Sequence, residues 1–263
     1  GVIRNGGRSW FGIGPFGIQP SEIAKLALII FTSKYLSNHN NKMNRTKNYV
    51  LPILFIICFI FFLIMLEPDF GSGAITVMSV IALIFTSNIK ISLFIILGII
   101  AIIGIIILVI IAPYRVARIT SYLNPWSDPL GSGFQIIQSM YAIGPGGLFG
   151  LGLGNSIQKH FYLPEPQTDF IFSIIAEELG FIGILILAIS YITLFYNCMK
   201  LSLETPDLFG KYLSFGLIIE LVLQTLLNLL VVVGLIPVTG VTLPFLSYGG
   251  SSLIITLISM GIV

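Results

Sequence analysis

Two short acidic stretches contain the residues whose types and spacing are best suited to chemistry. The first is Tyr-Leu-Pro-Glu-Pro-Gln-Thr-Asp, which ends at Asp169. Pro164 and Pro166 hold this backbone extended and prevent a helix before about residue 167. Thr168 then predicts the cap of a helix that begins at Asp169. A carboxylate at the mouth of an apolar helix is either a partner of the helix dipole or a functional group, and the residues alone leave both alternatives open.

The second stretch is Glu67-Pro-Asp-Phe-Gly71, which predicts a turn between two helices. Its acids are either solvated within the turn, or Glu67 is a second carboxylate near Asp169. Two neighbouring carboxylates can separate their pKa values, so that one acts as a base and the other stabilises charge.

Two further pairs have side chains suited to anionic groups. Arg115 and Arg118 follow a proline at a predicted helix end. They either extend to lipid headgroups or bind a pyrophosphate through paired hydrogen bonds. Gln158 and Lys159 follow a glycine-rich stretch, residues 144–154, that lacks the residue order of a nucleotide-binding loop. We interpret that stretch as close backbone packing and the Gln-Lys pair as a candidate contact for an anion.

The composition indicates an integral membrane protein. Of 263 residues, 56% are hydrophobic and only 9% are charged, whereas a soluble domain has about 25% charged residues. The net charge of +2 gives no argument for nucleic acid as a partner. Cys58 and Cys198 have neither metal-site nor redox spacing. There is no histidine pair or HExxH motif, and His39 is expected in an inner loop whereas His160 stands alone in an outer one, so a catalytic metal held by histidine is not indicated.

The apolar runs predict an all-α membrane domain with about seven spans. The expected helices cover 20–36, 50–66, 73–87, 92–112, 169–196 and 212–234, and one begins near Ser251. Residues 1–19 predict a loop with an interfacial tryptophan, Trp10. Residues 113–168 predict a long loop that is more than a connector. The Gly/Pro-rich residues 234–250 predict a re-entrant segment, which a membrane tolerates only against protein.

The loop charges predict the orientation of these spans. Residues 37–49 include Lys42, Arg45 and Lys47 and no acid, so the positive-inside rule places them and residues 197–211 in the cytoplasm. Residues 113–168 are then external. The polar residues that fall on the outer side are Arg8, Trp10, Glu67, Asp69, Arg115, Arg118, Asp128, Gln158, Lys159, Glu165 and Asp169. Any chemistry is therefore expected at the outer membrane face.

Charged residues within apolar helices are expected to pair inside the protein. Glu22 and Lys25 are three residues apart and share a helix face. Glu177, Glu178 and Glu220 are expected to pair with Asn, Gln or Lys on neighbouring helices. On one continuous helix, Glu177 lies on the same face as Asp169, and Glu178 points away.

Several motifs in a fixed order resemble one family. They are Arg8-Ser-Trp10, Gln19-Pro-Ser-Glu-Ile-Ala-Lys25, Glu67-Pro-Asp-Phe-Gly71, Tyr122-Leu-Asn-Pro-Trp126, Leu163-Pro-Glu-Pro-Gln-Thr-Asp-Phe-Ile-Phe172 and Pro237-Val-Thr-Gly-Val-Thr-Leu-Pro-Phe-Leu-Ser-Tyr-Gly-Gly-Ser-Ser252. Together they resemble the SEDS family, the shape, elongation, division and sporulation proteins of bacteria. The Gln158-Lys159 pair and Asn124-Pro-Trp126 are more similar to its division and sporulation branch than to its rod-shape branch.

The resemblance implies a fold, an activity and a partner. It implies ten transmembrane helices, of which the first three are missing from this chain, so we expect a fragment. It implies a multi-pass protein of the bacterial cytoplasmic membrane, a peptidoglycan glycosyltransferase that polymerises lipid II. The acceptor is a lipid-linked GlcNAc, and the donor is a glycan on undecaprenyl pyrophosphate. It also implies a class B penicillin-binding protein as the partner that cross-links the product.

The resemblance also implies the roles of individual residues. Asp169 matches the family's essential acid and Glu67 a second important carboxylate, so both are predicted to be catalytic. The predicted substrate-binding residues are Arg8, Trp10, Lys25, Arg115, Arg118, Gln158, Lys159 and Glu165. The departing pyrophosphate needs positive charge from Arg, Lys or a divalent cation such as Mg²⁺, and no other cofactor is implied.

Two other classes of function compete with the enzyme. A transporter that flips lipid II would also have charged residues within its helices. A scaffold would only recruit the penicillin-binding protein. The gathering of polar groups on one face, rather than at the membrane midplane, favours the enzyme.

Overall fold

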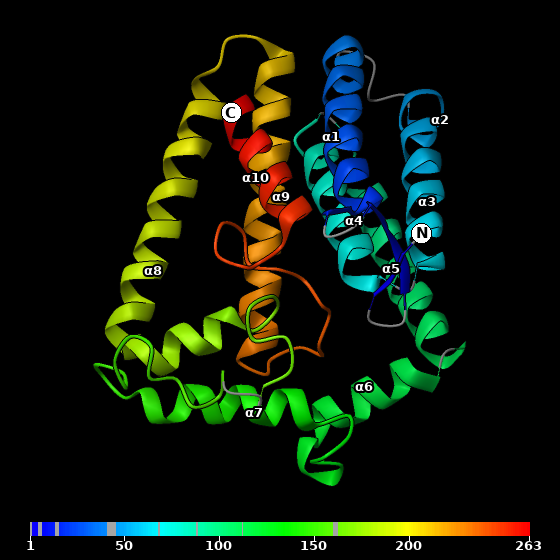
Figure 1. The fold of residues 1–263 in the computed structure, drawn as a ribbon. Coiled ribbons are helices and arrows are strands. Elements are labelled where there is room, and N and C mark those ends of the chain that lie inside the picture. Colours follow the sequence, from blue (N-terminus) through cyan, green and yellow to red (C-terminus); the bar gives the residue numbers. More distant parts are fainter. Residues whose placement is uncertain are drawn as a thin grey trace. The chain divides into compact units, whose positions relative to one another are not determined.

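The chain folds mainly into helices, with a small sheet at its start and irregular segments before α8 and before α10 (Figure 1). The computed structural model describes residues 2–4, 7–13, 16–40, 46–67, 69–87, 89–111, 113–159 and 163–263. It divides into two compact units. The first comprises residues 1–90, 193–225 and 248–263, and the second comprises residues 91–192 and 226–247. Two helices, α8 (Ile171–Glu204) and α9 (Leu208–Val232), contribute to both units.

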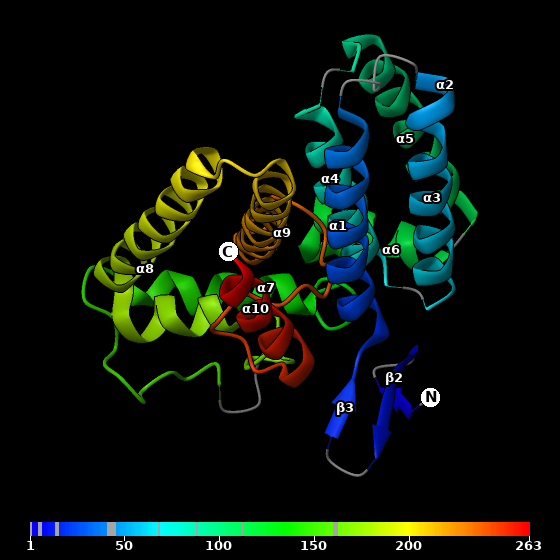
Figure 2. The same ribbon diagram turned by 90° about the horizontal axis from the view of Figure 1, so that it is seen from above.

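The first unit begins with a small antiparallel sheet, where the sequence predicted a loop. Its strands are β1 (Val2–Arg4), β2 (Gly7–Ile13) and β3 (Phe16–Ile18), in the order β1-β2-β3. Figure 2 shows β2 beside β3 ahead of the first helix. The loop was predicted because of the glycines in this stretch. The β-branched and aromatic residues between them favour hairpins instead.

The helices of the first unit pack around α1. They are α1 (Pro20–His39), α2 (Thr46–Tyr49), α3 (Leu51–Leu66), α4 (Phe70–Phe85) and α10 (Gly250–Ile262). Helix α1 packs against α3, α4 and α10, and α3 packs against α4. Gly73 of α4 lies against Met65 and Phe61 of α3, and a Cβ at this position would lie 2.9 Å from Met65 Cε.

Most of the predicted spans are confirmed within a few residues. Helix α1 extends three residues beyond the predicted end at 36, and α4 begins three residues before the predicted start at 73. The early start of α4 has a local cause, because the carboxylate of Asp69 accepts a hydrogen bond from the backbone N–H of Ser72 at 3.0 Å. Asp69 is thus an N-cap that satisfies one of the unpaired donors at the start of α4.

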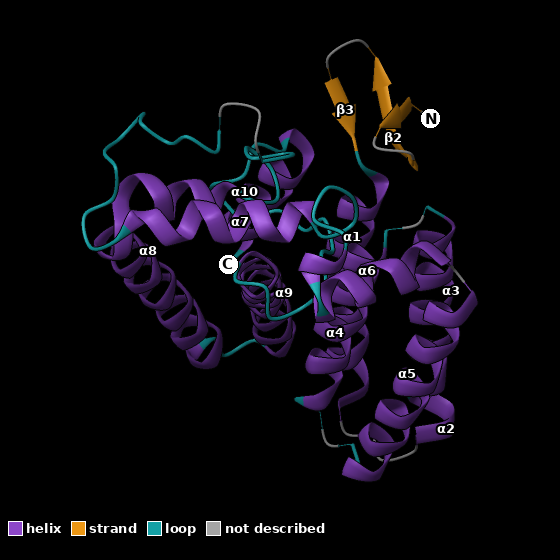
Figure 3. Cartoon of the chain, turned by 90° about the horizontal axis from the view of Figure 1, so that it is seen from below, coloured by secondary structure: helices purple, strands orange, loops and turns teal. Residues whose placement is uncertain are grey.

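The second unit contains two helices that were predicted as part of a long loop. After α5 (Ile91–Ile111) come α6 (Pro113–Leu123) and α7 (Phe134–Ile143), each followed by a short 3₁₀ turn, η2 (Pro125–Ser127) and η3 (Gly144–Gly146). Both helices are too short to span a membrane, and the glycine content of residues 113–168 hid their 3.6-residue patterns. Figure 3 shows α7 lying beside the first part of α8.

Buried hydroxyl groups connect three helices of the second unit. The hydroxyl of Ser139 in α7 donates a hydrogen bond to the carbonyl of Val232 in α9 at 2.7 Å. The same oxygen lies 2.8 Å from the hydroxyl oxygen of Ser173 in α8. Both serines are fully buried, so their hydrogen bonds satisfy polar groups that water does not reach.

Helix α8 is not the single helix predicted for residues 169–196. It begins at Ile171, extends to Glu204 and is interrupted at Gly180, whose backbone is non-helical (φ 64°, ψ −161°). A Cβ at Gly180 would lie 2.4 Å from the backbone nitrogen of Gly150. Glycine is therefore required both for the left-handed φ and for this close backbone approach. The change of direction is visible between the two parts of α8 in Figure 1.

The described helices include three that are long and apolar enough to cross a membrane, namely α5, α8 and α9. Helices α3, α4 and α10 are shorter and also apolar. No residue of helix α5 is fully buried, and most of its apolar side chains are exposed. These features confirm the predicted class, an all-α membrane protein with several spans.

Candidate functional site

Asp169 lies in a turn that precedes α8, and not in the first turn of the helix as predicted. The helix begins two residues later, at Ile171. Thr168 is not its N-cap, because the Thr168 hydroxyl contacts the carbonyl oxygen of Glu165 at 3.2 Å and its carboxylate at 3.1 Å. Glu165 has a left-handed backbone (φ 53°), which closes this turn. A threonine hydroxyl that binds a preceding turn is not available to accept a hydrogen bond from the helix N-terminus.

The backbone on both sides of Asp169 is fixed by two buried side chains. Asn228 of α9 donates one hydrogen bond from Nδ2 to the carbonyl of Asp169 at 2.7 Å. The hydroxyl of Ser247 donates to the preceding carbonyl, that of Thr168. Asn228 is 1% exposed and Ser247 is 7% exposed. Two consecutive peptide units are therefore held in place, which restricts the direction in which the Asp169 side chain leaves the backbone.

The two side chains that hold the Asp169 turn also bind the irregular segment 233–249. Asn228 Nδ2 also donates to the carbonyl of Val241 at 2.7 Å, and Ser247 Oγ accepts from the backbone N–H of Leu243 at 2.7 Å. Asn228 therefore connects the segment to the turn that carries Asp169. Two tyrosines bind further carbonyls of the segment. Tyr122 donates to Leu235 at 2.9 Å, and Tyr191 donates to Pro244.

These contacts confirm that the segment is irregular and packed against protein. Backbone carbonyls away from water must find donors, and in a membrane only protein can supply them. Here the donors come from α6, α8 and α9. Asn228, Ser247 and Tyr191 were not predicted as site residues. The only sequence signal for them was a polar residue within an apolar or Gly/Pro-rich stretch.

The Asp169 carboxylate lies next to an exposed glycine. A Cβ at Gly240 would lie 3.6 Å from Asp169 Oδ2. Gly240 has a left-handed backbone (φ 75°) and is exposed, whereas Asp169 is half-buried. Gly240 therefore contributes no side chain to this side of the carboxylate.

Glu67 lies in the first unit, at the turn between α3 and α4. It is half-buried at the end of α3. Burial raises the pKa of Glu67 above its usual value, and the neighbouring charge of Asp69 raises it further. Asp69 also accepts a hydrogen bond from Gln19 Nε2 at 3.0 Å, which ties this turn to the start of α1. Because Asp169 belongs to the second unit, a role for Glu67 beside it stays a prediction.

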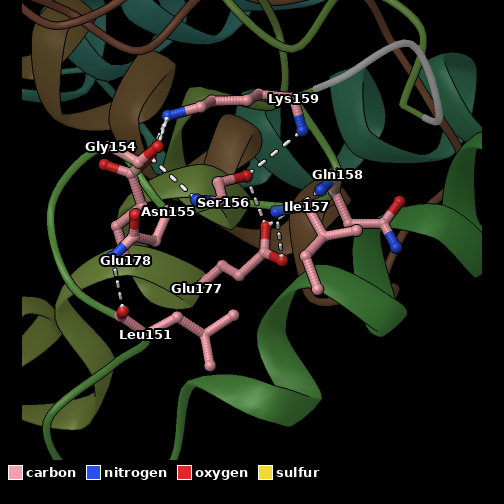
Figure 4. A network of polar contacts seen from close by, with 9 residues as sticks. All are labelled: Leu151, Gly154, Asn155, Ser156, Ile157, Gln158, Lys159, Glu177 and Glu178. Atoms are coloured by element: carbon pink, nitrogen blue, oxygen red, sulfur yellow. Dashed lines mark hydrogen bonds and ion pairs between the residues drawn. The ribbon is translucent and has the colours of Figure 1, made fainter.

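Glu177 anchors the loop that follows the glycine-rich stretch (Figure 4). Its carboxylate accepts hydrogen bonds from the Ser156 hydroxyl, from the backbone N–H of Ile157 at 3.0 Å and from that of Gln158 at 3.4 Å. Glu177 is 1% exposed. A buried carboxylate with several donors is well satisfied, and this role is structural.

Glu178 binds the same loop, although it was predicted to point away from Glu177. It pairs with Lys159 Nζ at 2.8 Å and accepts from the backbone N–H of Ser156 at 3.3 Å. Lys159 Nζ also donates to the carbonyl of Gly154. The prediction assumed that Glu177 and Glu178 lie on different faces of a straight helix and contact different neighbours. In the structure, one loop crosses this part of α8 and contacts both glutamates. The predicted pairing of Glu178 with a lysine is confirmed, but Lys159 lies in this loop and not on a neighbouring helix. For Glu177 the predicted pairing with Asn, Gln or Lys on a neighbouring helix is wrong, because its partners are a serine hydroxyl and backbone N–H groups of the loop.

We call Ser156, Ile157, Gln158, Lys159, Glu177 and Glu178 the polar knot. It explains the environment of two predicted substrate-binding residues, Gln158 and Lys159, which hold this loop on α8. Their contact with substrate stays a prediction.

Close backbone packing of the glycine-rich stretch is confirmed. A Cβ at Gly146 would lie 2.2 Å from the carbonyl oxygen of Ala176, and one at Gly150 would lie 2.1 Å from that of Glu178. The backbone N–H of Leu151 donates to Glu177 O at 2.9 Å. Side chains at these glycines would prevent the stretch from lying directly on α8.

Lys25 is buried in an ion-pair cluster of the first unit. Its Nζ lies 2.9 Å from Glu22 Oε1 and 3.4 Å from Glu220 Oε1. The predicted Glu22–Lys25 pair and the predicted pairing of Glu220 with a neighbouring helix are both confirmed. Lys25 is 1% exposed, so in this structure it faces two carboxylates of the protein. Its predicted role in substrate binding is not tested by these contacts.

Among the remaining predicted site residues, the structure describes the side chain of Trp10 but not those of the arginines. Trp10 is half-buried in β2, paired in the sheet with Val2. The side chains of Arg8, Arg115 and Arg118 lie outside the described residues. Within the described ranges, no group of three or more His, Cys, Asp or Glu side chains is arranged to hold a metal ion.

The fold and the site define a helical membrane protein in which the turn that carries Asp169 is tied to an irregular segment. Residues 1–263 match the model of the cell cycle proteins that groups FtsW, RodA and SpoVE, and the chain belongs to this family. It is 53% identical over 262 residues to stage V sporulation protein E of Bacillus subtilis (strain 168), covering all of this chain and 72% of that protein. It is 41% identical to the probable peptidoglycan glycosyltransferase FtsW of Geobacter sp. (strain M18), covering all of this chain and 71% of that protein.

Solved structures show the same fold. One is described as "Structural coordination of polymerization and crosslinking by a peptidoglycan synthase complex" and has a TM-score of 0.79 at 34% identity, covering 99% of this chain and 73% of that chain. The crystal structure of the rod shape determining protein RodA of Thermus thermophilus has a TM-score of 0.68 at 31% identity, covering 99% and 69%. The higher identities to the sporulation and division proteins agree with the predicted branch.

Proposed function

We propose that this protein is a peptidoglycan glycosyltransferase that polymerises lipid II at the outer face of the bacterial cytoplasmic membrane. Family membership and the names of its relatives support this activity. The structural observation that carries the assignment of the site is the position of Asp169. Its carboxylate lies beside exposed Gly240, on a backbone that two buried side chains hold. A half-buried carboxylate on a fixed backbone suits a general base.

Asp169 acts on the acceptor in this reaction. It removes the proton from the 4-hydroxyl of the lipid-linked GlcNAc while that oxygen attacks the anomeric carbon of the donor. The bond from the anomeric carbon to the pyrophosphate oxygen breaks, and the polyprenyl pyrophosphate leaves with the bonding electron pair. The energy comes from the donor's pyrophosphate linkage, so no nucleotide is needed. General base catalysis contributes roughly 10²–10⁴-fold to the rate.

The leaving pyrophosphate requires positive charge. We assign this role to Arg115 and Arg118 in α6, because guanidinium groups bind phosphate oxygens through paired hydrogen bonds. A divalent cation such as Mg²⁺ would serve the same purpose. Glu67 supports the base, and Arg8, Trp10 and Glu165 contact the substrate in this proposal, whereas Lys25 stays paired with Glu22 and Glu220. Lys159 forms an ion pair with Glu178, and Gln158 lies beside it in the same loop.

The partner that we propose is a class B penicillin-binding protein, which cross-links the glycan. The similarity to a peptidoglycan synthase complex that coordinates polymerisation with crosslinking supports this partner. Apolar surface is available for a single-span partner and for lipid tails, since α5 has no buried residue. Nothing in the composition favours nucleic acid.

Polymerisation by the purified full-length protein tests this function. The protein is reconstituted in detergent with lipid II, without another polymerase, and the products are separated by length. We expect glycan strands from the wild type and none from Asp169→Asn, which keeps the shape of the side chain and removes the proton acceptor. The loss should be deep, since base catalysis alone contributes roughly 10²–10⁴-fold. Expression and association with the penicillin-binding protein should be unchanged.

The same experiment separates the enzyme from its two competitors. A transporter would leave lipid II unpolymerised in detergent. A scaffold would also give no strands in this assay, unless a separate polymerase were added. If Asp169→Asn polymerised at a rate within a few-fold of wild type, Asp169 would not be the base, and Glu67 and Glu165 would be the next candidates.

A further inference from the structure

We infer that Asn228 is a positioning residue for the reaction, which locks the Asp169 turn to the irregular segment so that the carboxylate is presented beside Gly240. This inference rests on the proposed role of Asp169. Asn228 lies in α9, 59 residues from Asp169 along the chain, and its side chain is 1% exposed. It does not need to touch substrate, because it acts on the backbone that carries the base.

The hydrogen bonds of Asn228 use both of its N–H donors. Nδ2 lies 2.7 Å from the carbonyl oxygen of Asp169 and 2.7 Å from that of Val241. Two carbonyl oxygens facing one amide group fix its orientation, because a rotated amide would place its own oxygen against both. No carboxylate or aliphatic side chain of this size can supply two such donors. The two segments are therefore joined through a single side chain.

The oxygen of the Asn228 amide indicates that this residue contributes little to stability. Its Oδ1 is buried and has no hydrogen-bond partner among the described residues. A buried acceptor without a partner loses the hydrogen bonds that it would make to water. That cost offsets much of what the two N–H bonds contribute to stability. A small net gain in stability makes the placement of Asp169 the stronger reason for an asparagine here.

Ser247 provides a second point of attachment for the same turn. Its hydroxyl donates to the carbonyl of Thr168, one peptide unit before the carbonyl held by Asn228. It also accepts from Leu243 N–H at 2.7 Å, so it fixes the irregular segment at the same time. Two anchors on consecutive peptide units restrict the rotation of the backbone between them. Asn228 and Ser247 thus set both the position of Asp169 and its distance from Gly240.

The expected effect of losing Asn228 is on turnover more than on substrate affinity. A misplacement of about 1 Å at a reacting group can reduce the rate by about 10²-fold. Asn228→Ala should therefore lower kcat by about 10- to 100-fold and change the KM for lipid II by less than about 3-fold.

The matched control is Ser139→Ala, in the same unit. Ser139 is also fully buried, and its hydroxyl donates to a backbone carbonyl of α9, that of Val232, at 2.7 Å. It bonds to Val232 and Ser173 rather than to the Asp169 turn. The full-length wild type, Asn228→Ala, Ser247→Ala and Ser139→Ala are compared for kcat and KM with purified lipid II. Rates are corrected for the folded fraction, measured by thermal unfolding.

A second variant gives a readout that a purely structural residue would not produce. Asn228→Asp is isosteric but places an ionised carboxylate against two carbonyls. Protonation restores one donor, so its kcat relative to wild type should rise as the pH falls, whereas that of Asn228→Ala should not. The folded fraction is measured at each pH, so that recovery of structure is separated from recovery of rate.

The outcomes separate this inference from the function on which it rests. The inference is supported if Asn228→Ala, and to a smaller extent Ser247→Ala, lose kcat while Ser139→Ala stays within about 3-fold of wild type. It is overturned if the corrected losses of Asn228→Ala and Ser139→Ala are equal, or if neither is impaired while Asp169→Asn is inactive. If Asn228→Ala does not fold, Ser247→Ala and Asn228→Asp decide. Wild-type activity of Asp169→Asn would instead overturn the assigned base, and with it this inference.

Discussion

Lys25 of α1 and Glu220 of α9 form a buried ion pair, with 3.4 Å between Nζ and Oε1. Glu22 lies 2.9 Å from the same ammonium group. The side chains of Lys25 and Glu220 are 1% and 3% exposed. One cation therefore compensates two carboxylates and connects helices that are far apart in the sequence. Ionised groups in such surroundings are tolerated because they are paired.

Removal of Lys25 should be far more damaging than removal of Glu220. Lys25→Met leaves two buried carboxylates without a counter-charge, which costs about 3–5 kcal/mol. Glu220→Gln leaves Lys25 paired with Glu22, and should change stability much less. Thermal unfolding of the full-length protein in detergent measures both. If Lys25→Met were as stable as Glu220→Gln but could not use lipid II, Lys25 would instead have the substrate-binding role that the sequence predicted.

Within the polar knot, Glu177 should matter more for stability than Glu178. Glu177 is buried and accepts from three groups of the loop, so Glu177→Gln turns an amide N–H toward existing donors. The Glu178–Lys159 pair is partly exposed, and such pairs contribute about 0–1 kcal/mol. Unfolding temperatures of Glu177→Gln and Glu178→Gln compare the two effects. A larger loss for Glu178→Gln would contradict this order.

Much of the helical framework could be predicted from the sequence, since long apolar runs have few alternatives in a membrane. The Glu22–Lys25 pair also followed from spacing alone, because both residues belong to one helix. The capping role of Thr168 was predicted wrongly for a local reason. Threonine can bond to a preceding turn as well as to a helix N-terminus, and the left-handed Glu165 decided in favour of the turn.

The environment of Asp169 could not be predicted, because it depends on tertiary contacts. In the sequence, Asn228 is one polar residue in an apolar helix, and its neighbours in the sequence do not indicate the two carbonyls that it binds. The interruption of α8 at Gly180 has the same origin. A glycine within an apolar run is tolerated in a helix, and only the approach of Gly150 shows why it breaks this one.

The raised pKa of Glu67 predicts a pH effect on the reaction. Burial and the charge of Asp69 keep Glu67 protonated to a higher pH than an ordinary glutamate, whose pKa is about 4.3. If its charge supports the base, the rate should fall as the pH is lowered through this raised pKa, and Glu67→Gln should lower the rate and remove that limb. Rates of polymerisation across a pH series measure both effects.

The stability of the Glu67 variant should change in the opposite direction. A carboxyl whose pKa is higher in the folded than in the unfolded state favours folding below the unfolded pKa. That contribution is lost as the pH rises through the folded pKa. At neutral pH Glu67→Gln should therefore be at least as stable as wild type. A less stable variant with an unchanged pH profile would leave Glu67 with a structural role in its turn.

The arginines of α6 are expected to differ from lysine in their effect on the donor. Arg118→Ala should weaken use of the pyrophosphate-linked donor more than Arg118→Lys, because lysine keeps the charge and loses the paired hydrogen bonds. Initial rates at varied lipid II concentration compare the two variants with wild type. Wild-type rates for both would leave Arg118 as a residue that extends to lipid headgroups.

Gly240 is expected to control access to the Asp169 carboxylate. In Gly240→Ala the new methyl group would lie 3.6 Å from Asp169 Oδ2, on a side that is now exposed. The left-handed backbone adds a strain of about 1–2 kcal/mol for an alanine. Gly154→Ala is the matched control, because Gly154 also has a positive φ (84°) and is exposed, and its Cβ would meet nothing within 4 Å. Both variants should lose similar stability, measured by thermal unfolding. Only Gly240→Ala should lose polymerisation per folded molecule, and equal rates for the two would show that the acceptor hydroxyl reaches Asp169 from another side.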